Sequence, residues 1–428
     1  MFVGKNDVER SVIKNKFFTE TSWSVMAKAV AFLFYFLLNV YLARVLGVDK
    51  FGEWSFFYSM VSVAGIVSFF GVNTSGQKYI AEHSGAGNFM AICRDSLKLR
   101  FLFSAFFSVL IFFAREHLAE ILGRPDFSRL FAFAAPLVFF MGFTEFVKSV
   151  SMGLHRLKYH FIVNFAEFGL KLLLTVVFLT VSFQLASIVN AFTAASFLAF
   201  ALGVYFIHKD HRGDDTAGGG RNFTAEILKY SLPLFVISIG FLIATEIDVL
   251  MLGLLSSDEQ VGLYAVVKQV VGKLPHISVA VAIGTMPVFA RLNRDNRKEL
   301  SRLFDRLIFI NSGIFILVAA VILIFSGMLV PLVFGSQYSG SVLPLKILTV
   351  FLVSSPLLVF FGGFLNYQGL AWRRAAYLGI STAANITLNI VLIPLYGAVG
   401  AAISTSLAYL PYVLLSGLEV RKRFRSYA

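Results

Sequence analysis

The sequence predicts an all-α polytopic membrane protein, and three observations carry this prediction. Hydrophobic residues make up 57% of the 428 residues and charged residues only 14%, whereas about a quarter of a soluble globular protein is charged. The mean hydropathy is +0.78. The apolar residues, among them 48 phenylalanines, gather in blocks of about 20 residues, the length of a helix that crosses a hydrocarbon core.

Twelve apolar segments predict twelve transmembrane helices. Polar residues, glycine or proline separate each segment from the next. Residues 1–20 are polar and basic, without the apolar run and small-residue site of a cleavable signal peptide. In chain order, the predicted helices cover 21–45, 51–73, 98–115, 130–150, 160–182, 184–207, 226–253, 260–288, 304–333, 341–367, 374–394 and 397–419.

The basic residues predict the orientation of these helices. The net charge is +13, and most basic residues lie in alternate connecting segments. The segments on the other side hold only Arg44, Lys50, Arg115, Arg124 and Arg129. Because cytoplasmic segments are rich in lysine and arginine, we expect a cytoplasmic (plasma) membrane protein with both termini in the cytoplasm. Charge distributed in this way is a topology signal and does not indicate nucleic-acid binding.

A polar segment divides the sequence into two halves of similar length. Residues 208–223, HKDHRGDDTAGGGRNF, are rich in glycine and charge, the composition of a flexible linker. We therefore predict an N-terminal six-helix bundle over 1–208, a cytoplasmic linker over 209–223 and a C-terminal six-helix bundle over 224–428.

Short matches at equivalent places indicate that the halves are repeats. Leu46–Trp54, between the first two predicted helices, is similar to Leu252-Gly253 with Gln260–Tyr264, between the seventh and eighth. Met152–Arg156 is similar to Gln368–Arg373 in the same way. Since six helices precede the second copy, the repeats run in parallel. Transporters with parallel repeats bind their substrate in a central cavity between the halves.

Several short motifs occur in a characteristic order along the whole chain. They are NVYLARVLG at 39–47 with FG at 51–52, FGV at 70–72 with KYIAE at 78–82, YSLPL at 230–234, ID at 247–248, VGLY at 261–264, Asn385, Asn389, IPLYG at 393–397 and GAA at 400–402. In this order the chain resembles the oligosaccharide flippase (Wzx-type polysaccharide biosynthesis) family of the multidrug/oligosaccharidyl-lipid/polysaccharide exporter superfamily.

This resemblance implies a V-shaped fold of two bundles and a function. The family translocates polyprenyl-diphosphate-linked oligosaccharides by alternating access, for the assembly of cell-surface polysaccharide. The expected partners are therefore the lipid-linked oligosaccharide, membrane lipid and glycan-assembly proteins, and we expect the protein to act as a monomer. The wider group also contains multidrug pumps, so an ion-coupled multidrug exporter of the same fold is the alternative.

Lysines inside the predicted helices are candidates for the substrate site. A lysine at the bilayer centre costs at least about 2.5 kcal/mol, so it is expected to face protein or water. Lysine also binds a mobile phosphate as a point charge. We assign Lys28, Lys268 and Lys273 to the diphosphate, because their helices line the central cavity in the resembled fold. Snorkelling to the membrane surface is the alternative for Lys28 and Lys346 and the expectation for Lys148.

Glu167, Glu246 and Asp248 are candidates for coupling transport to H⁺ or Na⁺. A carboxylate in an apolar segment is a plausible site for a proton or a cation. Lys171 follows Glu167 by four residues on the same helix face, so an internal ion pair is the favoured alternative there. For Asp248 the alternative is a cap of the outer loop or a pair with a neighbouring helix. Glu246 and Asp248 are two residues apart and point to different faces, so they cannot share one ion directly.

The sequence does not indicate an enzyme. It contains no pair of the Asp-x-Asp type in a loop, no glycine-rich phosphate loop and no paired histidine ligands. The longest outer loop, about 116–129, is short for a membrane glycan polymerase or glycosyltransferase, which is the least favoured alternative. The single cysteine, Cys93, cannot form an internal disulfide. We therefore expect a transporter without a bound cofactor or metal.

Overall fold

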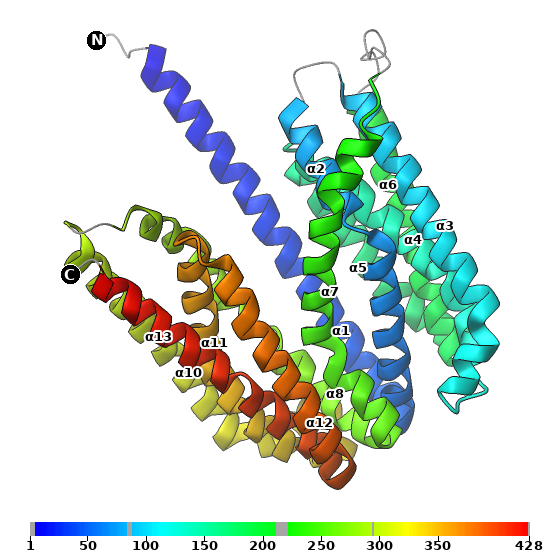
Figure 1. Cartoon of the computed structure of the whole chain (residues 1–428). Coiled ribbons are helices and arrows are strands. Elements are labelled where there is room, and N and C mark those ends of the chain that lie inside the picture. Colours follow the sequence, from blue (N-terminus) through cyan, green and yellow to red (C-terminus); the bar gives the residue numbers. More distant parts are fainter. Residues whose placement is uncertain (1–4, 84–87, 211–220, 293–294, 427–428) are drawn as a thin grey trace. The chain divides into compact units, whose positions relative to one another are not determined.

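The computed structural model is helical through nearly all of the residues that it describes, which are 5–83, 88–210, 221–292 and 295–426 (Figure 1). Within these ranges, nine helical segments are long and apolar enough to cross a membrane, and a bent helix pair over 224–255 makes ten. Two of them, Ser22–Phe69 and Ala371–Ser426, have 48 and 56 residues, enough for two spans each. The protein is thus a multi-pass, all-α membrane protein, as predicted.

The described helices have the following bounds in chain order. They are α1 (Lys5–Phe69), α2 (Val72–His83), α3 (Phe89–Ile121), α4 (Phe127–Gly153), α5 (Leu157–Val181), α6 (Leu185–Asp210), α7 (Thr224–Leu255), α8 (Asp258–Val271), α9 (His276–Thr285), the 3-10 helix η1 (Met286–Arg291), α10 (Arg297–Phe334), the 3-10 helix η2 (Ser336–Ser341), α11 (Val342–Tyr367), α12 (Ala371–Ala408) and α13 (Leu410–Ser426).

Two glycines turn the chain inside the longest helices. Gly47 in α1 has φ 79° and ψ 173°, and Gly397 in α12 has φ 54° and ψ −127°. Glycine adopts positive φ without the steric cost that other residues pay. Gly47 lies between the first two predicted helices and Gly397 is the first residue of the twelfth, so α1 and α12 each contain two helices joined without a loop. With these two junctions, the described part has the twelve spans that the sequence predicts.

The structure differs in detail from the predicted elements at three places. The second predicted helix breaks at Phe70 and Gly71, which have φ of 46° and 70°. The eighth breaks between α8 and α9, where Gly272 and Pro275 weaken helix propagation. The expected outer loop over 116–129 is mostly helical, because α3 continues to Ile121 and α4 begins at Phe127.

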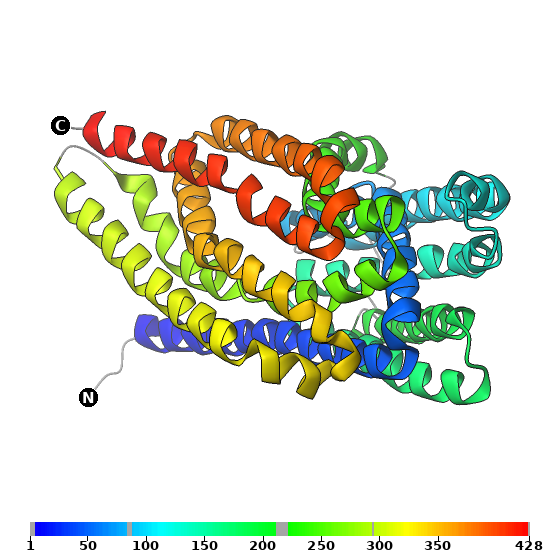
Figure 2. The ribbon, with the colours of Figure 1, turned by 90° about the horizontal axis from the view of Figure 1, so that it is seen from below.

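The helices pack into two compact units. Unit 1 contains Met1–Leu38 and Met60–Leu242, and unit 2 contains Asn39–Ser59 and Ile243–Ala428. In unit 1, α4 packs against α2, α3 and α6, and α5 packs against α6 (Figure 1). In unit 2, α11 packs against α10, α12 and α13 (Figure 2).

The compact units differ from the predicted bundles in one respect: α1 and α7 each contribute to both units. The predicted bundles, 1–208 and 224–428, describe the repeat in the sequence, and that division stays a prediction. Most of the predicted linker over 209–223 lies outside the described residues.

Each unit has an apolar core and exposes large apolar side chains. In unit 2, aromatic rings of five elements pack together, with the ring centroids of Phe289 and Phe304 at 5.2 Å and those of Phe364 and Phe424 at 5.0 Å. Phe113, Val181 and Phe309 are exposed on α3, α5 and α10. In a membrane protein, lipid covers such side chains, because the hydrocarbon core is as apolar as they are.

The two copies of a repeat motif meet within unit 2. A Cβ on Gly52 would lie 1.8 Å from the carbonyl oxygen of Asp258, and a Cβ on Gly262 would lie 2.2 Å from that of Val48. Gly52 and Gly262 occupy equivalent places in Leu46–Trp54 and Gln260–Tyr264. The matched segments therefore cross with their backbones in contact, which small residues allow in membrane helices.

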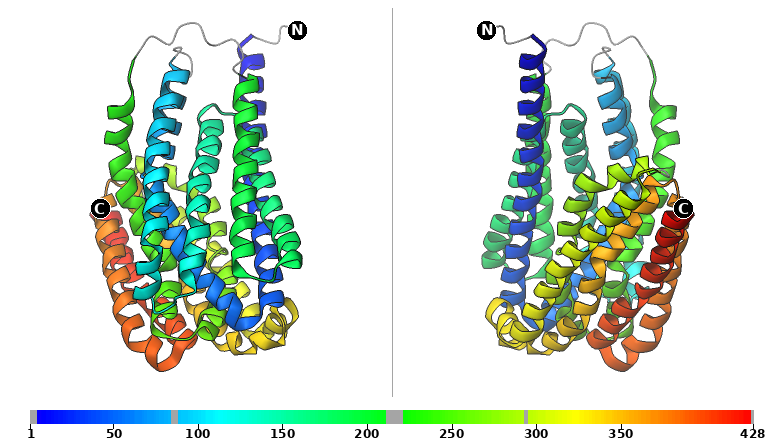
Figure 3. Two further views of the ribbon diagram at one scale, coloured as in Figure 1. Left: turned by 90° about the vertical axis from the view of Figure 1, so that its right-hand side faces the viewer. Right: turned by 90° about the vertical axis from the view of Figure 1, so that its left-hand side faces the viewer.

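Hydrogen bonds stabilise the same part of unit 2. The Tyr338 hydroxyl in η2 donates to the carbonyl oxygen of Ala43 at 3.0 Å. The side chain of Gln260 accepts from the backbone N–H of Ala398 at 2.9 Å, directly after the turn at Gly397. Figure 3 shows the turn between α10 and α11 and the bend within α12 at one end of this unit.

Replacing Gly262 with alanine is expected to lower the melting temperature of the purified protein by several degrees. The added Cβ would overlap the Val48 carbonyl, and overpacking typically costs about 1–3 kcal/mol. The matched control is Gly313→Ala in α10, where a Cβ meets nothing within 4 Å. This control should be neutral or slightly stabilising. Equal melting temperatures for the two variants, measured in detergent, would contradict the glycine crossing.

Candidate functional site

A cluster of three charged residues lies where α8 ends in unit 2. The Lys268 ammonium is 2.8 Å from Glu246 Oε2, and the Ser59 hydroxyl donates to the same carboxylate oxygen at 2.9 Å. Lys273 lies in the break between α8 and α9 and interacts electrostatically with both charged residues. We call Lys268, Lys273 and Glu246 the lysine cluster; it has one surplus positive charge.

The lysine cluster is accessible. The side chains of Lys268 and Glu246 are 26% and 22% exposed, and Lys273 is exposed. One residue after Lys268, the Gln269 amide donates to Asn39 Oδ1 at 3.4 Å. In many transporters the substrate and ion sites are formed by discontinuous helices. The two lysines can hold an anion. The side-chain amides of Gln269 and Asn39 lie beside them and can hydrogen-bond the hydroxyl groups of a ligand.

A buried carboxylate lies elsewhere in unit 2, where α7, α8 and α12 meet. Asp248 accepts hydrogen bonds from the Tyr264 hydroxyl at 2.8 Å, the Thr405 hydroxyl at 2.6 Å and the Asn389 amide at 2.8 Å. The Asn389 amide also donates to Asn385 Oδ1 at 3.2 Å. We call these five residues the carboxylate site.

The negative charge of Asp248 is compensated by the dipoles of hydroxyl and amide groups. No lysine or arginine of the described ranges forms an ion pair with Asp248. The side-chain oxygen of Asn389 is buried without a hydrogen-bond partner in the described part. The site thus offers several oxygen atoms and one negative charge, a donor set that suits a proton or a hard cation.

Glu246 and Asp248 have different partners, as their spacing predicts. Glu246 contacts Ser59 and Lys268, whereas Asp248 contacts residues of α8 and α12. The expected alternative for Asp248, a pair with a neighbouring helix, matches these contacts. The sequence analysis assigned no role to Tyr264, Asn389 or Thr405. The four-residue spacing of Asn385 and Asn389 in an apolar helix is the signal that could have identified a polar face.

A buried chain of alternating charges joins α4 and α5 in unit 1. Lys171 Nζ is 2.5 Å from Glu167 Oε1, and Lys148 Nζ is 3.0 Å from Glu167 Oε2. Lys148 also pairs with Glu145. We call these four residues the charge chain. The side chains of Lys148, Glu167 and Lys171 are only 5–6% exposed, so each charge depends on its neighbours for compensation.

The charge chain tests two expectations. The ion pair between Glu167 and Lys171 is present, as their spacing allows. Lys148, which was expected to snorkel, is instead buried between Glu145 and Glu167. The reason is that Glu167 reaches Lys148 from another helix, a contact that sequence spacing does not reveal.

Lys28 and Lys346 are both exposed. Lys28 lies on α1 in unit 1 and interacts electrostatically with His160. Lys268 and Lys273 belong to unit 2. The assignment of Lys28 to the substrate stays a prediction.

A further charged residue, Arg100, lies near the start of the predicted helix over 98–115, and its side chain is fully buried in α3. Its Nε donates to the Ser104 hydroxyl at 2.9 Å, and its Nη2 donates to the carbonyl oxygen of Ser68 at 2.7 Å. The available signal was the four-residue spacing between Arg100 and Ser104, which puts both on one helix face.

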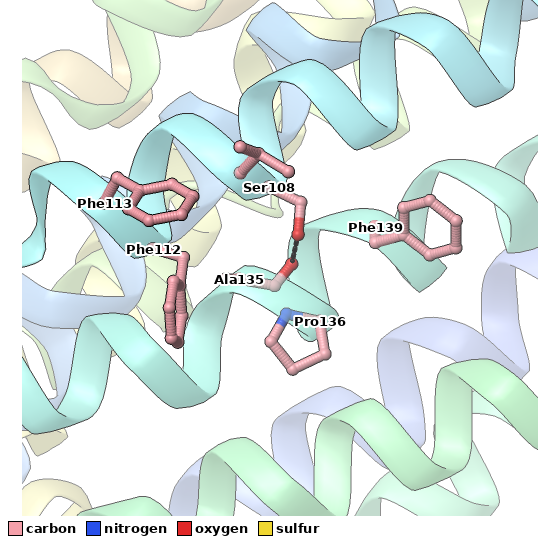
Figure 4. A pocket seen from close by; sticks show the side chains of 7 residues that line it. Ser108, Phe112, Phe113, Ala135, Pro136 and Phe139 are labelled. Atoms are coloured by element: carbon pink, nitrogen blue, oxygen red, sulfur yellow. Dashed lines mark hydrogen bonds between the residues drawn. The ribbon is translucent and has the colours of Figure 1, made fainter.

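A cavity of about 300 Å³ lies between α3 and α4 (Figure 4). Its one polar side chain, Ser108, donates to the carbonyl oxygen of Ala135 at 2.7 Å. The other lining residues are Val109, Phe112, Phe113, Ala135, Pro136 and Phe139. With one hydroxyl that already donates to the backbone and no charged lining residue, this apolar cavity is poorly suited to a sugar or a phosphate.

Replacing Glu167 with glutamine is expected to lower the melting temperature strongly. The change leaves two buried ammonium groups without their shared carboxylate, and breaking a buried pair costs about 3–5 kcal/mol. A second change, Lys171→Met, should recover part of the loss because it removes one stranded cation. Lys50→Gln is the control, since it removes an exposed ion pair with Glu53 that is worth less than about 1 kcal/mol. Wild-type stability of Glu167→Gln would show that the charge chain is not structural.

Comparisons of the sequence reveal two similar proteins in archaea. The probable low-salt glycan biosynthesis flippase Agl15 of Haloferax volcanii is 26% identical over 383 residues, which are 87% of this chain and 77% of that protein. An uncharacterized membrane protein of Methanocaldococcus jannaschii is 23% identical over 423 residues, covering 92% and 94% of the two chains.

Two solved structures have similar folds. An inward-facing multidrug resistance MATE family transporter of the MOP superfamily has a TM-score of 0.76 at 15% identity, covering 94% of this chain and 98% of that one. The lipid II flippase MurJ, in an inward closed conformation, has a TM-score of 0.76 at 14% identity, covering 95% and 90%. The fold class implied by the sequence motifs is thereby confirmed.

A family model described as polysaccharide biosynthesis protein matches residues 17–293. The matched residues make up more than half of the chain and include α1 to α9, so they contain both the lysine cluster and Asp248. By this match, the chain belongs to the polysaccharide biosynthesis protein family.

Proposed function

We propose that the protein is a flippase that translocates a polyprenyl-diphosphate-linked oligosaccharide across the cytoplasmic membrane by alternating access. Its product would be used in the assembly of cell-surface glycans. The observation that carries the proposal is the accessible lysine cluster, with its surplus positive charge, beside a helix break in a member of this family. The name of the relative Agl15 as a glycan biosynthesis flippase and the fold shared with MurJ support it.

The lysine cluster has the chemistry that a diphosphate requires. At an effective dielectric of about 20, two unit charges 4 Å apart attract each other by about 4 kcal/mol before desolvation. Two lysines can therefore retain the headgroup and still release it. Without cargo, Glu246 neutralises Lys268, so the lysine is not left unpaired. We infer that the diphosphate replaces Glu246 as the partner of Lys268.

A multidrug exporter of the same fold is the second candidate function. Many such cargoes are cations, and the MATE fold allows this function. The surplus positive charge of the lysine cluster would repel a cationic drug, so the flippase is favoured. We propose a transporter and assign no catalytic step to the lysine cluster or the carboxylate site.

We propose that the protein lies in the cytoplasmic membrane with both termini in the cytoplasm. The support is the uneven distribution of lysine and arginine between alternate connecting segments. Its partners would be the lipid-linked oligosaccharide, the surrounding membrane lipid and the glycan-assembly proteins that supply or use the cargo, and it would function as a monomer.

We further propose that the carboxylate site couples transport to H⁺ or Na⁺. Asp248 is buried and lacks a cationic partner among the described residues. Protonation or a bound sodium ion would neutralise it, and its contacts span α7, α8 and α12. Binding at this site can therefore shift the relative positions of these helices. Glu167, whose two oxygens are paired with lysines, is better suited to a structural role.

Replacing Lys268 with alanine is expected to abolish glycan export in cells that lack their own flippase. Lys268→Arg should retain part of the export, because charge rather than shape attracts the diphosphate. Membrane abundance of each variant is measured alongside export. Lys346→Ala is the matched control: it removes an exposed lysine of another predicted helix and should export normally.

Exchanging the charges of Lys268 and Glu246 distinguishes a role of Lys268 in substrate binding from a role in a structural ion pair. The double variant Lys268→Glu with Glu246→Lys keeps the pair and the net charge of the lysine cluster but moves the cation from α8 to α7. If Lys268 contacts the diphosphate, the double variant should export poorly although it is abundant. Full export by the exchanged pair, or by Lys268→Ala, would contradict the proposed headgroup site.

Replacing Asp248 with asparagine is expected to remove ion binding by the purified protein. If the ion is sodium, replacing K⁺ with Na⁺ at constant pH should raise the melting temperature of the wild type and not that of Asp248→Asn. If it is a proton, the two proteins should differ in the pH dependence of melting. Glu53→Gln, which removes an exposed pair with Lys50, should behave as the wild type. Identical Na⁺ and pH responses of Asp248→Asn and the wild type would refute ion coupling at this site.

A further inference from the structure

Three buried residues of unit 1 have polar atoms without a hydrogen-bond partner in the described part of the chain. These atoms are Nη1 of Arg100, both side-chain polar atoms of Asn73 and the hydroxyl oxygen of Ser96. The exposed fractions of the three residues are 0%, 7% and 0%. An unsatisfied buried polar group costs about 1–3 kcal/mol, and more if it is charged. Together these groups need an explanation.

The packing of α2 on α3 places Gly76 beside Ser96 and, one turn along the pair, Asn73 near Arg100. The two helices follow each other in the chain and pack together. A Cβ on Gly76 would lie 2.8 Å from the Ser96 hydroxyl, which fixes the register of the pair. Asn73 lies one turn before Gly76, and Arg100 lies one turn after Ser96. With a rise of about 1.5 Å per residue, antiparallel packing places Asn73 beside Arg100.

The guanidinium of Arg100 is fixed so that only Nη1 is unused. Nε donates to Ser104, and Nη2 donates to the Ser68 carbonyl at 2.7 Å and to the Ser68 and Ser104 hydroxyls at 3.0 and 2.5 Å. A Cβ on Gly142 would lie 2.6 Å from the guanidinium carbon, so this group lies flat on the backbone of α4. The ring of Phe69 is 5.1 Å from the same carbon.

The buried charges around Arg100 do not balance. Glu145 is the carboxylate that acts electrostatically on Arg100, but Glu145 already pairs with Lys148. Asp95, on the same helix, pairs with Arg94 and accepts the backbone N–H of Phe223. Arg100 and the charge chain together have three cations and two anions. One positive charge therefore lacks a counter-charge in the low-dielectric interior.

We propose that Arg100, Asn73 and Ser96 bind a monovalent anion of the size of chloride. Nη1 of Arg100, Nδ2 of Asn73 and the Ser96 hydroxyl supply up to five N–H and O–H donors, and the anion supplies the missing negative charge. A water molecule would satisfy some of these donors but would leave the charge uncompensated. A phosphate would bring a second charge and a larger volume into a fully buried place, where desolvation of charge is costly.

The anion site would stabilise the break between α1 and α2. Arg100 binds the carbonyl oxygen of Ser68 in the last turn of α1, and Asn73 is the second residue of α2. An anion held by Arg100 and Asn73 would connect the two helix ends across Phe70 and Gly71. This role is independent of the proposed flippase function and needs neither the lysine cluster nor a substrate.

The test uses the purified full-length protein in detergent without substrate. Sodium chloride is exchanged for sodium gluconate at constant sodium and ionic strength, and the melting temperature is measured. Saturating chloride is expected to raise it by at least about 3 °C, because a ligand that binds only the folded state stabilises it. Bromide, of similar size, should replace chloride. Asn73→Leu, which keeps the volume but removes both polar atoms, should lose the response.

Two further variants decide the result. Ser96→Ala should weaken the chloride response and serves as the second variant if Asn73→Leu does not fold. Lys268→Ala should keep the full response, which separates this site from the lysine cluster. Equal melting in chloride and gluconate would overturn the proposal and indicate buried water. A response lost in Lys268→Ala but kept in Asn73→Leu and Ser96→Ala would also overturn it, since the anion would then bind to the lysine cluster.

Discussion

The cost of an uncompensated charge or backbone dipole in hydrocarbon determines most of this structure. A helix satisfies its own backbone groups, so an apolar chain that crosses the membrane is helical almost throughout. Where the helix is interrupted, other groups must form hydrogen bonds with the backbone N–H and C=O groups that lose their partners. At the break after α1, Arg100 binds the Ser68 carbonyl, and at the break after α8 the chain places Lys273. The same constraint explains why Lys148, Glu167 and Lys171 are found together and not singly.

The charged groups of the protein differ in the kind of group that compensates their charge. Glu167 has a lysine on each oxygen and almost no exposure, so it has no capacity left for a ligand. The lysine cluster is partly exposed and has more positive than negative charge, and its Glu246 is a partner that an anion can replace. Asp248 is held by hydroxyl and amide groups alone. Compensation by dipoles leaves a site open to a cation, whereas compensation by full charges closes it.

Local sequence patterns predicted the parts of the structure that depend on neighbours within one helix. The number of helices follows from apolar length, the junctions at Gly47 and Gly397 from punctuation, and the pair of Glu167 and Lys171 from a four-residue spacing. The contact of Lys148 with Glu167 joins two helices, and that of Thr405 with Asp248 joins residues 157 positions apart. Such contacts depend on which helices pack together and in what register, which composition and periodicity do not determine. The burial of Arg100 against α4 is likewise visible only after packing.

The crossing of Gly52 and Gly262 also bears on the history of the chain. If the two halves arose by duplication of one ancestral gene, the segment around Gly52 and the segment around Gly262 descend from a single segment. Equivalent segments that touch each other, each with a glycine whose Cβ would overlap a backbone carbonyl of the other, are what a self-associating ancestor would leave behind. An ancestral half-length protein could have formed its pair through this one surface, before fusion joined the two copies. Both descendants would then remain under a shared restriction, since enlarging either glycine damages a contact that the other copy still requires.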